Sequence, residues 1–490
     1  MTPNLTVMKS ETDAKVTTLK PKHRFDTIAI VTMISLMGLI VGAVSANLLS
    51  APRVVEYSWQ GKPIGAGDRG FSLTFDSPMD RDSVEANLQI DPDLPGKISW
   101  SGNTLFYTLT APPQYGETYQ VQLRGAKALR GEWGQESPRI ESFQAELPTR
   151  DRIVAYLGTQ GEEQGKIVLY NFTQDRRELL TPGDLTVVDF QPYPEGDRLL
   201  FSAIDSTLDD GNLDTLQLYT VTTGLNYTNA ENPQPPGRIQ RLLDASQYRN
   251  LKFDLSPDGN LIVVERVNRN NTQDTALWVI RDNQLPRSLG TQAVDFTITP
   301  DSQSVAVVQE NGVSLLPLTP EAPSLEFYRN YQGILGFTPD TGEMLLLRVG
   351  ANGTRSLALT DDPGETTPIL QTLADIRNCE FDLMQPHLAY CFQIGGENQS
   401  PRQPLVAAIN LKQGENLPFI GLSNYPEVIL NMSPDGVALG FDQVVPQPNQ
   451  PDQLEANLWI LPTPNFRPNR EPEIAPPERL FPGLNPVWIP

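Results

Sequence analysis

The second half of the chain repeats one pattern of apolar and polar positions. Residues 253–264 show it most fully: an apolar strand, the turn Ser256-Pro257-Asp258-Gly259, and a second strand rich in β-branched residues. Proline presets φ and glycine tolerates positive φ, so this tetrapeptide closes a tight turn between two paired strands. The recurrence of such strand–turn–strand units predicts an all-β architecture for the region 148–490.

The spacing of the turns identifies the repeating unit. Turn prolines fall at Pro192, Pro257, Pro300, Pro339, the variant Gln385-Pro386, and Pro434. Most intervals are roughly 40–50 residues, and a unit of that length with four short strands is typical of a β-propeller blade. The first interval is longer because it contains the polar insert 228–237.

The two ends of this region predict how the ring closes. Residues 485–490 read as an inner strand that stops where the next strand should follow, and runs at 151–156 and 166–170 supply the continuation. We therefore expect the C-terminal strand to complete the first blade, which hides sheet edges that would otherwise pair with other chains. The turns and the split unit predict seven blades. Six blades is the alternative, if the variant at Gln385 is not a repeat.

A separate all-β module is expected at 52–147. About seven short runs alternate apolar and polar residues, with turn residues between them, as in a β-sandwich. Its characteristic positions are Phe75-Asp76-Ser77-Pro78-Met79-Asp80, Ile90-Asp91-Pro92, Trp100 and residues 115–119. They resemble those of the bacterial Ig-like domains of S-layer (SbsA-type) and surface proteins. The resemblance implies a spacer or adhesive module without catalytic residues.

The N-terminal region contains one long apolar segment. Residues 27–49 carry no charge, and at about 1.5 Å per residue they span roughly 30 Å of hydrocarbon. Lys20, Lys22 and Arg24 precede the segment, so the positive-inside rule places residues 1–26 in the cytoplasm and the bulk of the chain outside it. We predict a single-pass anchor in the plasma membrane. The alternative is a cleaved signal peptide, since small residues at 44–46 offer a cleavage site.

Charge and a second resemblance narrow the class of partner. The formal net charge is −22, and an acidic body repels phosphate backbones, so we expect no nucleic-acid partner. The Ser-Pro-Asp-Gly turns, with Leu277-Trp278-Val279 and Leu458-Trp459-Ile460 on third strands, resemble TolB-type, WD40-like propellers of bacterial envelope proteins. The resemblance covers most of 151–490 and implies a protein that acts by binding proteins, peptides or glycans. It carries over no functional residue.

Few residues are suited to catalysis. The two histidines are His23 in the N-terminal tail and His387 in a turn, and the sequence has no G-x-S-x-G motif. Residues 65–70 match G-x-G-x-x-G but lead into an alternating strand, whereas a dinucleotide site needs a helix there, so they predict a loop. We therefore expect no enzyme activity, no catalytic residue and no cofactor.

Two side-chain pairs are candidate structural sites. Cys379 and Cys391 fall opposite each other across a predicted hairpin, where they can form a disulfide outside the cytoplasm; two buried thiols are the alternative. Asp210 and Asp214 belong to the acidic run 205–214, which resembles part of a calcium loop. Leu208 stands where a further oxygen ligand is needed, so we expect a solvated loop and keep calcium as a weak candidate.

Together these features predict a membrane-anchored extracytoplasmic binding or scaffold protein. The sandwich is the expected spacer and the propeller the platform for a protein or cell-wall glycan, with contact loops at 205–214, 228–237 and 443–477. The alternative is an envelope carbohydrate-active or hydrolytic propeller enzyme, which carboxylates and aromatics converging on the axis would favour. A self-assembling surface component is a third class. No particular oligomeric state is predicted.

Overall fold

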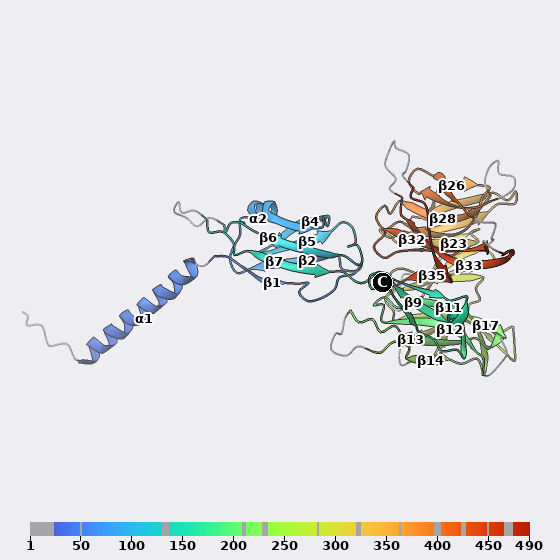
Figure 1. The fold of residues 1–490 in the computed structure, drawn as a ribbon, viewed down its shortest axis with the longest axis horizontal. Coiled ribbons are helices and arrows are strands. Elements are labelled where there is room, and N and C mark those ends of the chain that lie inside the picture. Colours follow the sequence, from blue (N-terminus) through green and yellow to red (C-terminus); the bar gives the residue numbers. More distant parts are fainter. Residues whose placement is uncertain are drawn as a thin grey trace, which may run out of the picture.

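The computed structural model describes residues 24–49, 51–129, 137–207, 212–227, 234–281, 284–319, 325–361, 364–395, 403–422, 428–447, 450–464 and 474–490. Within these ranges the side chains of 24–27, 41–49, 447 and 450–453 are not described. A helix, a β-sandwich and a ring of sheets follow one another along the chain, and the sandwich lies between the helix and the ring (Figure 1).

Helix α1 (Arg24–Leu49) contains the apolar segment. Every described side chain at 28–40 is exposed, and the large apolar ones include Ile28, Ile34 and Leu39. Among the described residues, no helix meets the length and apolarity needed to cross a membrane. The predicted span 27–49 lies partly outside the described side chains, so the anchor stays a prediction.

The sandwich consists of two antiparallel sheets and one short helix. The first sheet has the order β1-β2-β5-β4, formed by β1 (Val54–Tyr57), β2 (Gly70–Phe75), β5 (Thr104–Leu109) and β4 (Gly96–Ser101). The second has the order β3-β6-β7, formed by β3 (Leu88–Asp91), β6 (Thr118–Leu123) and β7 (Phe143–Pro148). Helix α2 (Arg81–Asn87) is capped by Asp80, whose carboxylate accepts a hydrogen bond from the Ser83 N–H at 3.1 Å.

Period-two alternation explains the core of the sandwich. Phe71, Leu73 and Phe75 on β2 point inward and are buried, while the residues between them are partly exposed. The rings of Tyr57 and Phe71 pack edge-on with centroids 5.6 Å apart. The two-sheet arrangement agrees with the predicted β-sandwich. The finer resemblance to bacterial Ig-like domains stays a prediction.

The described residues of the rest of the chain form seven four-stranded antiparallel sheets. Blades 1 to 3 are β35 (Leu484–Trp488), β8 (Ile153–Leu157), β9 (Ile167–Asn171), β10 (Arg176–Leu179); β11 (Leu185–Pro192), β12 (Arg198–Asp205), β13 (Gln217–Thr222), β14 (Ile239–Leu243); β15 (Tyr248–Leu255), β16 (Leu261–Asn268), β17 (Thr275–Arg281), β18 (Arg287–Ser288).

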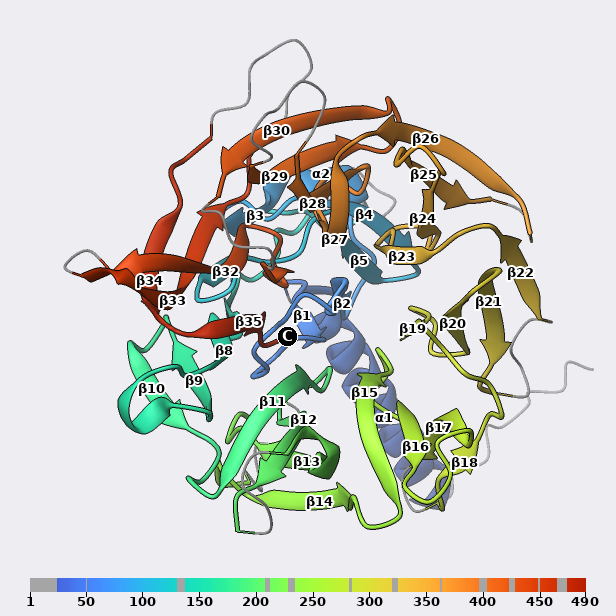
Figure 2. The same cartoon turned by 90° about the vertical axis from the view of Figure 1, so that its right-hand side faces the viewer.

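Blades 4 to 7 follow the same plan. They are β19 (Asp295–Ile298), β20 (Ser304–Gln309), β21 (Gly312–Pro317), β22 (Glu326–Arg329); β23 (Gly333–Phe337), β24 (Met344–Val349), β25 (Arg355–Thr360), β26 (Thr366–Thr372); β27 (Asp375–Phe381), β28 (Leu388–Ile394), β29 (Pro404–Asn410), β30 (Glu415–Gly421); β31 (Leu430–Met432), β32 (Ala438–Gln447), β33 (Gln450–Pro462), β34 (Glu478–Pro482). Figure 2 shows them as a ring with the first strand of each blade nearest the axis. The protein is therefore a seven-bladed β-propeller, and the six-bladed alternative is wrong.

The ring closes as predicted. Strand β35 pairs with β8, with Val487 opposite Ala155 and Trp488 opposite Val154, so the last strand of the chain is the inner strand of blade 1. Seven hydrophobic clusters of the propeller each lie between two adjacent blades. A blade that buries both faces against neighbours reads as nearly continuous apolar strands, as β20 does.

Two turn assignments made from the sequence need correction. In blade 2 the Gly196 N–H donates to the Tyr193 carbonyl at 2.9 Å, as Gly259 donates to Ser256 at 2.8 Å, so the turn begins at Tyr193 and not at Gln191. Pro192 instead ends β11. In blade 6 the N–H of Asp382, the first turn residue, donates to the Leu388 carbonyl. In blade 3 the equivalent bond joins the Ser256 N–H to the Leu261 carbonyl, so the variant turn is one residue longer.

Candidate functional site

A repeated hydrogen bond joins the inner strands of neighbouring blades near the axis. In four blades, the side chain of the next-to-last residue of the inner strand accepts a hydrogen bond from a backbone N–H of the following blade. The pairs are Gln191 Oε1 with Leu255 N at 2.8 Å, Asp254 Oδ2 with Ile298 N at 2.7 Å, Glu380 Oε2 with Met432 N at 3.3 Å, and Asn431 Oδ1 with Trp488 N at 2.8 Å. We call these the inter-blade bonds. They satisfy backbone donors that no ladder pairs.

Two of the remaining interfaces differ for visible reasons. Between blades 1 and 2 the acceptor position holds Val487 and the donor position holds Pro192, which has no N–H, so no donor is left over. Between blades 5 and 6 the acceptor position is Gly336, and a Cβ there would lie 2.7 Å from Cε2 of Phe381. The aromatic ring takes the space that a polar side chain occupies elsewhere.

The axis carboxylates are enclosed by protein. Desolvation raises the pKa of Asp254, Asp189 and Asp442, although backbone hydrogen bonds to each of them partly offset the effect. Glu380 keeps some surface accessible along the axis, yet desolvation by the surrounding atoms raises its pKa to about 7. A carboxyl with that pKa has the proton affinity of a general acid, but its Oε2 is already held by the Met432 N–H.

A second polar group connects blades 1, 2 and 7. The backbone N–H of Asn485 donates to Asp442 Oδ2 at 2.9 Å, and its side-chain amide donates to Asp189 Oδ1 at 3.3 Å. Asp442 Oδ1 also accepts the Ile429 N–H at 2.8 Å. These carboxylates therefore serve as acceptors that fix the ring, including at the interface between blades 1 and 2, which lacks an inter-blade bond.

The sandwich docks on one face of the ring, which we call the turn face because it carries the turns between first and second strands. Asp435, in the Ser-Pro-Asp-Gly turn of blade 7, is 1% exposed. Its Oδ2 accepts the Tyr115 N–H of the sandwich at 3.0 Å and pairs with Arg152 Nη2 at 2.8 Å, while Ser433 Oγ donates to Oδ1 at 2.6 Å. The turn motif Ser433-Pro434-Asp435-Gly436 predicts a turn for Asp435, and its contact with the sandwich is not evident from that motif.

Arg150 adds a second connection at the same junction. Its Nη1 donates to the carbonyl of Pro490, the last residue, at 2.8 Å, and its guanidinium lies 4.7 Å from the Tyr227 ring centroid. Nη2 lies 3.5 Å from the Glu195 carboxylate. The segment entering the propeller is thereby tied to the segment that closes it.

The glycine-rich loop 65–70 lies beside this junction. Asp68 accepts the Gly65 N–H at 2.9 Å, and Gly70 begins β2, so the loop leads into a strand as predicted. A cavity of about 360 Å³ separates the sandwich from the ring here; its lining includes Asp68 and Arg69 of the loop together with Pro339, Pro386 and Pro434 of the turns.

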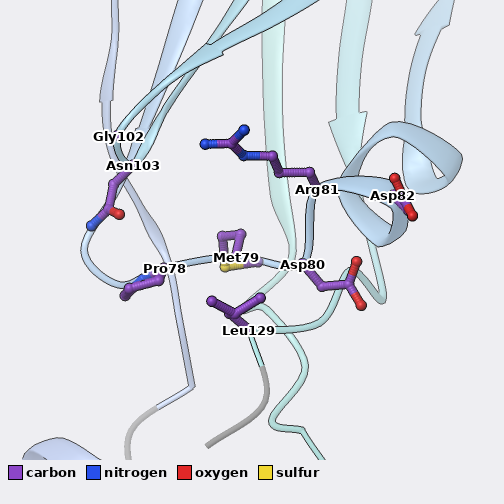
Figure 3. Close-up of a pocket in the computed structure, with 8 residues that line it drawn as sticks. All are labelled: Pro78, Met79, Asp80, Arg81, Asp82, Gly102, Asn103 and Leu129. Carbon is purple, nitrogen blue, oxygen red and sulfur yellow. The ribbon is translucent and has the colours of Figure 1, made fainter.

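A cavity of about 380 Å³ lies at the end of the sandwich (Figure 3). Met79 and Leu129 lie next to each other in it, and Arg81 projects above them. The Arg81 guanidinium lies 5.5 Å from the Trp100 ring centroid, and Asp80 is occupied as the cap of α2. Two of its polar side chains, those of Asp80 and Arg81, thus already contact other residues of the sandwich.

Three of the four predicted structural residues lie within the described part of the chain. Cys379 faces Cys391 across β27 and β28, with Cα atoms 4.1 Å apart, and the structure joins them by a disulfide. Asp210 lies outside the described residues, and the carboxylate of Asp214 pairs with Arg249 at 3.0 Å. Within the described ranges, no three His, Cys, Asp or Glu residues gather as metal ligands would.

The predicted histidine and loop sites lie only partly within the described residues. His23 lies outside the described residues, and His387 lies in the blade 6 turn, where its carbonyl accepts the Leu411 N–H at 2.8 Å. Parts of all three predicted contact loops also lie outside the description. The described portion of 443–477 extends strands β32 and β33.

No protein-family model matches the chain, and no curated protein matches it. Similar solved structures include TolB from Acinetobacter baumannii (10% identity, 81% of this chain and 82% of that one, TM-score 0.38). An oligogalacturonate lyase from Vibrio parahaemolyticus is also similar (10%, 60% and 88%, TM-score 0.42), as is a putative 6-phosphogluconolactonase from Bacteroides fragilis (11%, 69% and 98%, TM-score 0.42). TM-scores this low support no conclusion about activity. The seven sheets establish the propeller by themselves.

Proposed function

We propose that the protein is a membrane-anchored, extracytoplasmic binding or scaffold protein whose propeller presents one face to a protein partner. The observation that carries the proposal is the junction at Asp435 and Arg150. Because the sandwich is bound to the turn face, the opposite face, which we call the distal face, is directed away from the sandwich and α1 (Figure 1). A spacer fixed in this way holds the distal face outward.

Exposure of α1 supports the anchoring part of the proposal. Its described side chains at 28–40 are apolar for the most part and accessible all round the helix. In water this is unfavourable by roughly 25 cal/mol for each Å² of apolar surface, so such a helix requires an apolar environment. A lipid bilayer supplies one.

The enzyme alternative has less support. Carboxylates do converge on the axis, but Asp254 and Glu380 accept backbone N–H groups of the following blade, and Asp442 accepts the Asn485 N–H of blade 1. A glycosidase needs two carboxyl groups free to reach the scissile bond. Because these oxygens accept hydrogen bonds that hold the ring together, a structural role is favoured for them.

Site-specific photo-crosslinking tests the proposal. A photoreactive residue replaces Thr272 in the distal loop of blade 3, and the matched control replaces Leu285, an exposed residue on the turn face of the same blade. With the full chain in its membrane, we expect adducts with an envelope protein from position 272 and none from position 285. Equal labelling at both positions, or none at either, would contradict a distal binding platform. Turnover of cell-wall polysaccharide that is lost in Asp189→Asn would favour the enzyme.

A further inference from the structure

Three adjacent blades carry the same pair of residues at one place on the inner strand. In each pair an aliphatic residue is followed by a charged one. The aliphatic residue lies four positions before the last residue of the inner strand, and the charged residue lies three positions before it. The pairs are Val188-Asp189 on β11, Leu251-Lys252 on β15 and Val294-Asp295 at the start of β19. We call the six residues the bulge row.

A β-bulge explains why both members of each pair are presented. The pairing register shifts between Val187 and Asp189 and between Asn250 and Phe253. On β19, the Val294 N–H bonds to the Val308 carbonyl although Asp295 is the residue opposite Val308. Extra residues in a bulged strand break the strict alternation and re-aim side chains.

The aliphatic members are accessible to solvent. Their exposed fractions are 39% for Val188, 43% for Leu251 and 73% for Val294. The row does not continue round the ring: the equivalent positions of blades 5, 6 and 7 are Gly333, Arg377 and the buried Val428, and in blade 1 the partly buried Leu484 is followed by the uncharged Asn485. Strands β11, β15 and β19 lie on one side of the axis in Figure 2, which faces the distal surface. The row is therefore a one-sided strip beside the axis.

The charge around the strip is negative. Lys252 is paired with Asp295, and Glu265 is close enough to both to interact with them electrostatically. Glu310 lines, together with Val294 and Phe327, a cavity of about 390 Å³ that extends from the row onto blade 4. Asp189 also interacts electrostatically with Lys252, so three carboxylates surround one ammonium group, and Glu310 lies beyond Val294. A basic ligand is therefore electrostatically complementary.

We propose that the bulge row binds an extended segment of a partner protein that alternates aliphatic side chains and carries flanking lysine or arginine residues. The proposal rests on the distal binding platform proposed above and names its site. An extended peptide places alternate side chains on one face, so one face of it can carry the aliphatic residues that contact the row. A glycan would need aromatic faces to stack on; the six residues of the row include none, and the lining of the adjoining cavity has one, Phe327. A second copy of this chain is disfavoured because its net charge is −22.

Peptide binding to the full chain tests the proposal. The probe is a fluorescent peptide in which valine alternates with serine and lysine flanks both ends. The control peptides replace the lysines by glutamates or the valines by serines. We expect only the first to bind, with a Kd that weakens as salt is added.

Matched variants assign the binding to the row. In the double variant Leu251→Ser/Val294→Ser we expect at least about a tenfold loss of affinity, in keeping with two aliphatic contacts removed. Leu285→Ser, an exposed aliphatic on the other face, should bind as the wild type does. Because all three side chains are exposed, the melting temperatures should stay close to that of the wild type. Salt dependence in the wild type tests the proposal even if a variant unfolds.

Several outcomes overturn the proposal. Equal binding of the glutamate-flanked peptide removes the charge argument, and an equal loss in Leu285→Ser removes the site. If the lysine-flanked peptide does not bind, both the charge argument and the assignment of the site are wrong. If crosslinking at position 272 captures a partner that Leu251→Ser/Val294→Ser still retains, the distal platform stands and the bulge row is not its contact.

Discussion

Asp258 and Asp435 occupy the same place in two copies of one turn, yet their surroundings differ. Burial tends to raise the pKa of Asp258, but hydrogen bonds from Ser256 and Asn260 outweigh it and lower the pKa overall. Asp435 makes the same bond to its turn serine and in addition receives Arg152 and the sandwich. The turn role follows from the motif. The junction role depends on where the sandwich lands, which the motif does not encode.

Glu380 is expected to make stability depend on pH. Its pKa is about 7 in the folded chain, against an ordinary value of 4.5 for a glutamate, so near neutral pH the folded protein binds more protons than the unfolded chain does. Protonated Glu380 therefore makes a favourable contribution to the free energy of unfolding. This contribution is complete below pH 4.5 and is lost as the pH rises through 7. Glu380→Gln keeps an acceptor for Met432 and removes the buried charge. We expect it to be more stable than the wild type at pH 8 by up to about 3 kcal/mol.

Thermal unfolding measured across pH checks this expectation. The gain in melting temperature of Glu380→Gln should shrink toward zero as the pH is lowered to 4.5. Glu310→Gln, an exposed distal carboxylate, serves as the control and should show no such trend. A gain that is equal at both ends of the pH range would show that ionisation of Glu380 is not the cause.

The Cys379–Cys391 disulfide should stabilise the fold through its short loop. The two residues are 12 apart in sequence, and closing a loop of about that size in the unfolded chain contributes roughly 3 kcal/mol. Unfolding and refolding in reductant should therefore lower the melting temperature. The double variant Cys379→Ala/Cys391→Ala should not respond to reductant. A wild-type chain that is equally unresponsive would argue for two thiols.

At the scale of strands and turns, periodicity predicted the blades but not each register. Pro192 and Pro194 both follow the apolar run of β11, and only the bond from Gly196 to Tyr193 shows which of them lies in the turn. Opposition of Cys379 and Cys391 was predictable because both strands flank one hairpin. The bulges at Val188 and Leu251 were not, since a bulge depends on a partner strand that the local pattern does not contain.

Gly336 tests the interface between blades 5 and 6. Its φ of 129° disfavours other residues, and an added Cβ would meet the Phe381 ring at 2.7 Å. Gly336→Ala should lower stability by about 2–4 kcal/mol, through backbone strain and overpacking together. Gly342→Ala also has positive φ but meets nothing within 4 Å, so it isolates the backbone cost. Denaturant unfolding of both variants gives the comparison, and equal losses would show that the ring contact is unimportant.

At the scale of the whole molecule, the junction decides which propeller face is presented. The turn prolines of three blades and the loop 65–70 of the sandwich meet there, although more than 250 residues separate them in the chain. Arg150 brings the first residues of the propeller region onto its last residue. Sandwich docking and ring closure therefore share one set of contacts.

Asp435→Asn should loosen this junction. The amide weakens the charge-assisted bond to Arg152 and leaves a partly buried guanidinium less well paired, which costs about 1–3 kcal/mol. We expect faster proteolysis in the connecting segment 148–152 of the full chain. Asp258→Asn changes the same turn residue in a blade where Asp258 makes no described contact with the sandwich, and it should leave the cleavage rate unchanged. Equal acceleration in both variants would point to the turn and not to the junction.

The sequence by itself determined the all-β class, the closing strand and the facing cysteines, and it favoured seven blades over six, because short-range periodicity and turn chemistry repeat within each blade. It also identified the apolar segment at 27–49, which predicts a membrane anchor. Tertiary structure alone decided which carboxylates hold the ring, that Asp435 receives the sandwich, and that Val188, Leu251 and Val294 form one strip. These depend on contacts between segments far apart in the chain, where geometry and not local pattern sets burial, charge and exposure.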